Sequence, residues 1–283
     1  MGWYVPVQPP TPLSRVLACS WTATPSGTHR LVPDACLDLL WTSNAAIVLC
    51  GPETTAWDFA LPTGTTAVGV RFRPGRVTAV FDVDVSTLRD RRIPLEALAG
   101  RPAADALRAA IGAAAGPHER MQRLERFVDE RLHRPGSARS GSARSGSAGR
   151  GSACVDPWAE RVLETLATAP RATAGELAAR LGTTTRQLHR RSLASFGYGT
   201  STLARLLRFQ RFVSLADAAP PGRRSLAAIA VEAGYSDQAH LTRDCRAITG
   251  HTPTAFLRDA FPMFPDMSDP YKTDGAFIAT MAK

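Results

Sequence analysis

A near-perfect five-residue repeat fills residues 136–153, where the chain reads Gly-Ser-Ala-Arg-Ser twice and then continues with two close variants. Such a segment has no hydrophobic period and cannot bury a core. About 20 residues of this composition have ends roughly 25 Å apart on average. We therefore expect residues 135–154 to be a flexible linker that divides the chain into two separately folded parts.

The part before the linker, residues 1–134, has the pattern of a β-rich domain. Short apolar segments such as 45–50 and 65–72 are separated by Pro, Gly, Asn and Thr, which favour turns. The segments 102–114 and 117–132 instead space their apolar residues by three and four, which predicts helices. We expect a small β-barrel or sandwich closed by one or two helices.

The part after the linker is helical in pattern, and the whole chain is therefore predicted as a two-domain α+β protein. Residues 155–260 form the second domain, and residues 261–283 form a C-terminal tail. Asp156 and Pro157 suit a helix start, as cap and first-turn residue, and Pro170 ends that helix.

Residues 173–196 have the pattern of a helix-turn-helix unit. Thr173 and Glu176 predict a capping box, and Gly182 suits the left-handed turn after the first helix. Thr183 or Thr184 can cap the second helix. Leucines pack the two helices together. The exposed face of the second helix is predicted to carry Thr185, Arg186, Gln187, His189, Arg190 and Arg191.

Residues 225–250 repeat this arrangement. Ser225 caps the first helix, Gly234 makes the turn, and Ser236 is expected to cap the second helix. Leu241 faces inward. The exposed face is predicted to carry Asp237, Gln238, Ala239, Thr242, Arg243 and Arg246. One such unit is a weak signal, but two with an Arg at the same helical position are hard to obtain by chance.

The spacing and charge around the two units suit DNA. Residues 201–219 read as one helix of roughly 28 Å, close to the roughly 34 Å between successive major-groove faces on one side of DNA. The chain carries a formal net charge of +9, concentrated in its centre and C-terminal third, as a polyanion binder requires. Arg can fork onto guanine and Gln can pair with adenine.

Residues 155–258 resemble the DNA-binding domain of the AraC/XylS family of bacterial regulators. Residues 233–243, residues 249–253 and residues 207–211 carry the resemblance. It places base-reading positions on Arg186, His189, Arg190, Gln238, Ala239, Thr242 and Arg243. The chain departs from the family at Ser192 and Cys245, where a buried Phe is usual. The resemblance implies a transcription regulator that binds a double-stranded DNA operator, as activator or repressor, with RNA polymerase and a second copy of the chain as further partners.

The first half resembles a domain found on a subset of these regulators, through residues 31–41, 51–53 and 68–75. This resemblance implies an effector-sensing or dimerising role. A candidate small-molecule site consists of Asp34, Asp38, Trp41, Arg71 and Arg73, because two arginines on one strand face can hold a carboxylate. The competing interpretation pairs the arginines with Asp34, Asp38 or Glu53 and places Trp41 in the core.

Other classes of protein find little support in the composition. The sequence has no run of 18 apolar residues, so no membrane span is expected. The N-terminus lacks the pattern of a signal peptide, so we expect a cytoplasmic protein. We do not expect an enzyme. The five cysteines form no Cys-x-x-Cys pair, so no metal or other cofactor is expected.

Two alternatives remain open at this point. The chain could be a DNA-alkylation-repair or thiol-based sensor protein that uses an AraC-type domain, which requires a reactive Cys. It could also be a protein-interaction module built on the helical pairs, which would bind DNA weakly and without sequence preference.

Overall fold

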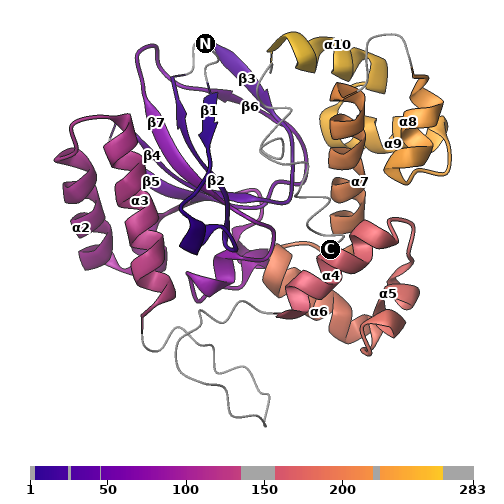
Figure 1. Cartoon of the computed structure of the whole chain (residues 1–283), viewed down its shortest axis with the longest axis horizontal. Coiled ribbons are helices and arrows are strands. Elements are labelled where there is room, and N and C mark those ends of the chain that lie inside the picture. The colour runs from indigo at the N-terminus through magenta and orange to yellow at the C-terminus, as the bar shows by residue number, and fades with distance from the viewer. Residues whose placement is uncertain (1–3, 25–26, 45, 135–156, 219–223, 264–283) are drawn as a thin grey trace.

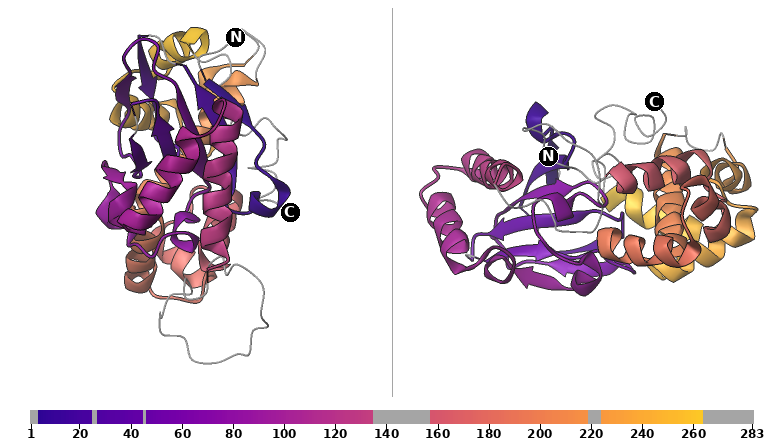
Figure 2. Two further views of the ribbon diagram at one scale, coloured as in Figure 1. Left: turned by 90° about the vertical axis from the view of Figure 1, so that its left-hand side faces the viewer. Right: turned by 90° about the horizontal axis from the view of Figure 1, so that it is seen from below.

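The computed structural model describes residues 4–24, 27–44, 46–134, 157–218 and 224–263, without the side chains of 259–263. The linker expected at 135–154, the cap expected at Asp156 and most of the tail lie outside these residues. A β-rich N-terminal domain lies beside a helical C-terminal domain (Figures 1 and 2). The predicted α+β class is confirmed.

Six strands of the N-terminal domain form one antiparallel sheet in the order β1-β2-β7-β4-β5-β8. A second sheet pairs β3 with β6. The described strands do not close a barrel, because β1 and β8 end the larger sheet. The strands are β1 (Tyr4–Val7), β2 (Leu17–Ala23), β3 (Thr28–Leu31), β4 (Leu37–Thr42), β5 (Ile47–Cys50), β6 (Trp57–Ala60), β7 (Ala67–Phe72) and β8 (Arg92–Pro94).

One face of the larger sheet is covered by a helical hairpin (Figure 1). Its helices are α2 (Arg101–Gly112) and α3 (Pro117–Leu132), close to the two predicted segments. Val68 and Val70 of β7 share a buried core with Leu124 and Val128 of α3. Shorter helices complete the domain, namely α1 (Leu95–Ala99) and the 3-10 helices η1 (Thr11–Leu13), η2 (Val77–Ala79) and η3 (Val85–Leu88).

Seven described helices build the C-terminal domain, and α7 runs through its centre (Figure 1). The apolar side chains of α7 are fully buried at Leu203, Leu206, Phe209 and Phe212, so this helix is the core to which the others attach. The helices are α4 (Pro157–Thr168), α5 (Ala174–Arg180), α6 (Thr185–Phe196), α7 (Thr200–Asp217), α8 (Leu226–Ala233), α9 (Gln238–Thr249) and α10 (Pro253–Met263).

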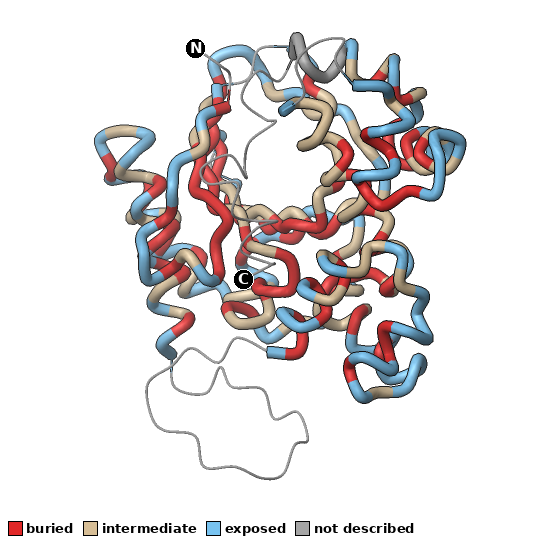
Figure 3. The backbone as a smooth tube through the Cα atoms, turned by 45° about the vertical axis from the view of Figure 1, so that its right-hand side comes forward, coloured by how far each residue is buried: buried red, intermediate tan, exposed pale blue. Residues whose placement is uncertain are grey.

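The two domains meet in an extensive interface near both helical pairs. The hydroxyl of Tyr198 donates to the carbonyl oxygen of Glu53 at 2.6 Å, and the amide of Ala56 donates to the carbonyl oxygen of Ile248 at 2.7 Å. Ala35, at φ 65°, belongs to the apolar core of the C-terminal domain. Figure 3 shows buried backbone in both domains where they meet.

Candidate nucleic-acid interface

The first helical pair, α5 and α6, is fixed by two successive capping boxes. The Thr173 hydroxyl accepts from the Glu176 amide, and the Glu176 carboxylate accepts from the Thr173 amide. Thr184, and not Thr183, caps α6 in the same reciprocal way with Gln187. Between the helices Gly182 adopts the left-handed conformation at φ 64°, which glycine reaches without steric cost.

The two helices of this pair pack through leucines. Leu177, Leu181 and Leu188 are buried between them, as the apolar spacing predicts. The opposite side of α6 faces solvent. Its exposed residues include five of the predicted DNA-contacting positions, which are Thr185, Arg186, Gln187, His189 and Arg190.

Two side chains on α6 have additional roles. The Gln187 side-chain oxygen accepts from the Thr184 amide and the Thr183 hydroxyl, so only its NH₂ group remains for a ligand. The guanidinium of Arg191 lies 4.3 Å from the ring centroid of Trp158 on α4. A cation above an aromatic face is attracted by the ring, so Arg191 joins α6 to α4.

The second helical pair, α8 and α9, follows the same plan with one difference. Ser225 caps α8 as predicted, and Gly234 makes the turn at φ 101°. The predicted cap of α9 at Ser236 is wrong. The Asp237 carboxylate accepts from the His240 amide at 2.6 Å, and the Ser236 hydroxyl hydrogen-bonds the side chains of Asp237 and His240.

Five of the six residues predicted on the exposed face of α9 are exposed. Gln238, Ala239, Arg243 and Arg246 are four of them. Thr242 is partly buried, and its hydroxyl donates to the Gln238 carbonyl oxygen at 2.8 Å. Asp237 is exposed but its carboxylate serves the helix, and the hydrogen bond from the His240 amide lowers its pKa.

The inner sides of α6 and α9 contribute side chains to the core of the C-terminal domain. Ser192 and Cys245, the two positions at which the sequence departs from the pattern it resembles, are both fully buried. The Cys245 thiol lies 3.7 Å from the Thr249 hydroxyl, which itself donates to the Cys245 carbonyl oxygen at 2.8 Å. Both positions thus carry small buried side chains.

A single helix and several arginines hold the two pairs together. Helix α7 has 18 residues and therefore spans roughly 27 Å, close to the predicted 28 Å. Arg208 on α7 donates to the Pro170 carbonyl oxygen and pairs with Asp244 on α9. Arg171 donates to the carbonyl oxygens of Gly234 and Tyr235. These bonds fix α9 relative to the loop between α4 and α5.

The two second helices present an Arg at the same position. Arg190 is the sixth residue of α6, and Arg243 is the sixth residue of α9. Helix α6 contains no acidic residue, and the single acid within α9, Asp244, pairs with Arg208. Both exposed faces are therefore positive, as contact with a phosphate backbone requires.

Three of the five candidate effector residues of the N-terminal domain, Asp34, Asp38 and Arg71, are brought together in one ion-pair cluster. Arg71 pairs with Asp34 and Asp38, each at 3.0 Å, so the predicted structural pairing is confirmed for Arg71. Burial raises the pKa of Asp34, although the nearby Arg71 opposes this effect. The indole of Trp21 also donates to Asp38, at 2.8 Å.

Trp41 and Arg73 lie apart from this ion-pair cluster. Trp41 belongs to the core beneath α3, whereas Asp38 points to the other face of β4, because side chains alternate along a strand. Arg73 follows the end of β7, and its Nε donates to the carbonyl oxygens of Ser14 and Leu17. The interpretation of Trp41 as a core aromatic is confirmed.

The described cysteines have the properties of structural thiols. Cys19, Cys36, Cys50 and Cys245 are free, and only Cys50 is more than slightly exposed. Burial raises the pKa of Cys19 and Cys245 to about 11 and that of Cys50 to about 12. Such thiols are protonated at neutral pH and react slowly. Cys154 lies outside the described residues.

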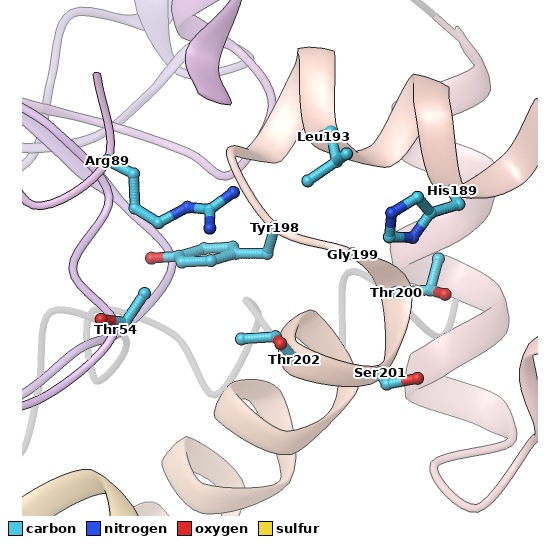
Figure 4. A pocket seen from close by; sticks show the side chains of 9 residues that line it. All are labelled: Thr54, Arg89, His189, Leu193, Tyr198, Gly199, Thr200, Ser201 and Thr202. Atoms are coloured by element: carbon cyan, nitrogen blue, oxygen red, sulfur yellow. The ribbon is translucent and has the colours of Figure 1, made fainter. Parts of the chain in front are cut away.

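A pocket that the sequence does not reveal lies where α6 and α7 meet the N-terminal domain (Figure 4). Its volume is about 450 Å³. Thr54 and Arg89 come from the N-terminal domain, and His189 comes from the exposed face of α6. The remaining lining residues are Leu193, Tyr198, Gly199, Thr200, Ser201 and Thr202.

The described residues contain neither a membrane-spanning helix nor a metal-binding cluster. No described helix is long and apolar enough to cross a membrane. Within the same residues, no group of three or more His, Cys, Asp or Glu side chains is arranged to hold a metal ion.

Comparison with known proteins agrees with the two-part organisation. Residues 177–259 match a family model described as a helix-turn-helix domain. Residues 6–94 match a domain of unknown function, DUF6597. No protein of curated function matches this chain in sequence.

Two solved structures resemble the chain only loosely. An apo ToxT variant from Vibrio cholerae strain SCE256 has 10% identity and a TM-score of 0.42, covering 91% of this chain and 98% of the other. ToxT from Vibrio cholerae O395 has 11% identity and a TM-score of 0.41, covering 84% of this chain and 95% of the other. On the family match over residues 177–259 and the two helical pairs, the C-terminal domain is an AraC-type helix-turn-helix domain.

Proposed function

We propose that this chain is a DNA-binding transcription regulator of the AraC type. In this proposal it binds a specific DNA operator by placing α6 and α9 in two adjacent major-groove segments. The observation that carries the proposal is the equivalent position of Arg190 and Arg243, each the sixth residue of a capped, exposed helix. Helix α7, which joins the two helical pairs, has 18 residues and spans roughly 27 Å, which is comparable with the roughly 34 Å of one turn of DNA.

The exposed side chains have the chemistry for reading bases. Arg190 and Arg243 can each donate two parallel hydrogen bonds to guanine, and Gln238 can pair with adenine. Ala239 can contact the methyl group of thymine. Arg186, near the start of α6, can contact a base or a flanking phosphate, since recognition helices use both.

The N-terminal domain is the regulatory part in this proposal. The loop that follows β3 carries Asp34, which pairs with Arg71 in the sheet. In the same loop, the Pro33 carbonyl oxygen accepts a hydrogen bond of 2.7 Å from Gln210 on α7. A small molecule that displaced Asp34 from Arg71 would therefore move a loop that contacts the helix between the two DNA-binding units.

The alternative of a thiol-based repair or sensor protein is not supported by the described cysteines. Cys19, Cys50 and Cys245 have raised pKa values, and an alkyl-accepting or redox-sensing thiol requires the opposite. We therefore propose no thiol chemistry for this chain.

The proposal is tested by selecting bound fragments of genomic DNA with the full-length chain. Specific binding predicts recovery of a shared sequence with two conserved segments. Recovery of fragments without a common sequence would favour a general polyanion binder or an interaction module and would contradict the proposal.

A further inference from the structure

The pocket between the domains is lined by the positively charged side chain of Arg89. Arg89 is not one of the proposed base-reading residues. The Nε of Arg89 donates to the Gly197 carbonyl oxygen at 2.9 Å, which anchors the side chain at the C-terminal end of α6. Within the part of the chain that the structure describes, nothing pairs with the two terminal nitrogens of Arg89. The guanidinium is thus held in place with its donor fork available.

The surroundings of Arg89 suit an anion. The pocket is lined by the exposed His189 and by the hydroxyl-bearing Ser201 and Thr202 in the first turn of α7. Figure 4 shows Arg89 beside the ring of Tyr198 at one end of the pocket and His189 at the other end. A guanidinium fork and several hydroxyl donors match the oxygens of a phosphate.

The acidic groups of the N-terminal domain near this pocket are occupied. Asp90 follows Arg89 in sequence, and its carboxylate accepts from the amide of Thr54 at 2.8 Å and from its hydroxyl. Glu53 forms an ion pair with Arg92. Arg89 therefore has no carboxylate partner among the described residues, although the charge of Asp90 reduces its net attraction.

The position of the pocket identifies the source of the anion. His189 is both a pocket residue and a candidate base-reading residue on α6. When a recognition helix enters the major groove, groups beside it come close to the phosphates that border the groove. We propose that Arg89, a residue of the N-terminal domain, binds a phosphate of the operator backbone beside α6.

This inference rests on the proposed function and adds a regulatory consequence. The phosphate contact exists only while the N-terminal domain is docked on α6 through Gly197. Undocking would remove one phosphate contact without altering the residues that read bases. Regulation by this route changes affinity equally for specific and unrelated DNA, because phosphates carry no sequence information.

The test is the salt dependence of DNA binding by the full-length chain, measured by fluorescence anisotropy between roughly 50 and 200 mM salt. Arg89→Ala should lower the slope of log affinity against log salt by about one. It should weaken binding to the selected operator and to an unrelated duplex by the same factor. Arg89→Lys should retain the slope, because the charge remains. An unchanged slope for Arg89→Ala would overturn the inference.

Two variants separate this role from simpler explanations. Arg126→Ala removes an equal charge from the exposed side of α3 and should leave the slope unchanged. Gln210→Ala removes another interdomain hydrogen bond without a charge and should also leave it unchanged. If Gln210→Ala lowered the slope as much as Arg89→Ala, loosening of the interface would explain the effect and the inference would fall.

A free anion is distinguished by titrating inorganic phosphate into the chain without DNA and measuring the heat of binding. Saturable binding that Arg89→Ala abolishes, together with an unchanged salt slope for DNA, would assign the pocket to a small phosphate and overturn the inference. If the unmodified chain does not distinguish operator from unrelated DNA, the proposed function itself fails. If it does distinguish them but the salt slope of Arg89→Ala is unchanged, only the inference about Arg89 fails.

Discussion

The guanidinium of Arg71 lies 3.0 Å from the carboxylate of Asp34, and the next residue, Ala35, belongs to the core of the C-terminal domain. One loop therefore joins a buried ion pair in the sheet to the helices that carry the DNA-binding faces. Arg71 also pairs with Asp38, so a single guanidinium balances two carboxylates. The side chains of all three residues are at most 16% exposed.

Arg71→Ala should destabilise the protein strongly, because it leaves two carboxylates buried without a counter-charge. Breaking a buried pair in this way costs about 3–5 kcal/mol. The free energy of unfolding in urea measures the effect. Arg108→Ala is the control, since its ion pairs with Glu96 and Asp105 are more exposed and its loss should cost roughly 0–1 kcal/mol. Equal costs for the two variants would contradict this account of the cluster.

Arg190→Ala and Arg243→Ala should each weaken binding to the selected operator by about 1–3 kcal/mol and relax the base preference at one position. The physical reason is the loss of a bidentate contact to a base. Competition binding with single-base variants of the operator measures both effects. Arg180→Ala, an exposed Arg on α5, is the control and should change no base preference. Unchanged affinity and preference in both variants would remove these residues from the reading face.

Gly197→Ala should destabilise the protein more than Gly182→Ala. Both glycines have positive φ, at 77° and 64°, where Ala costs roughly 1–2 kcal/mol. A Cβ at Gly197 would also lie 2.4 Å from Cγ of Pro52 in the other domain, whereas a Cβ at Gly182 meets nothing within 4 Å. Thermal denaturation measures the difference. Similar losses would show that the domains do not pack closely at Gly197 in solution.

Asp237→Asn should preserve both helix α9 and DNA binding, whereas Asp237→Ala should weaken both. Asn caps helices as well as Asp does, so the comparison separates capping from direct contact with DNA. The pKa of Asp237 is lowered from 3.8 by the His240 amide. Its stabilising contribution is therefore complete above pH 3.8 and is lost as the pH falls through the lowered pKa.

Circular dichroism melts between roughly pH 2 and 6 test this sign. The unmodified chain should lose stability on acidification more steeply than Asp237→Asn. A steeper loss in the Asn variant would mean that the carboxylate does not stabilise α9.

Cys19, Cys50 and Cys245 should resist alkylation in the folded protein at neutral pH, because burial raises the pKa of each thiol and keeps it protonated. Mass spectrometry after brief iodoacetamide treatment measures this, with Cys154→Ser used to remove the thiol outside the described residues. Denatured protein, in which all thiols are exposed, is the control. Rapid labelling of Cys19 or Cys50 in the folded protein would revive the thiol-based alternative.

The parts of this structure that sequence predicts well are local. The capping box of Thr173 and Glu176, the turns at Gly182 and Gly234 and the extent of α7 depend on residues within a few positions of one another. At the start of α9, two adjacent residues can both cap a helix. Sequence alone does not decide between Ser236 and Asp237, and the structure uses Asp237.

The separation of Trp41 from the ion pairs of Asp38 could be predicted from the sequence. Asp38 and Trp41 are three residues apart on one strand, and an odd separation places side chains on opposite faces. The interface is different, because Arg89, Gly197 and Tyr198 are brought together by folding over more than 100 residues. No periodic pattern marks such contacts, so neither the interface nor its pocket could be predicted.

The most direct test of the central claim is a hydroxyl-radical and base-contact footprint of the full-length chain on its selected operator. Two contacted segments on one face of the DNA should appear, with centres about 10–10.5 base pairs apart. Arg190→Ala should remove base contacts in one segment and Arg243→Ala in the other. A single segment, or a footprint that both variants alter in the same place, would contradict a structure in which α6 and α9 read adjacent major-groove sites.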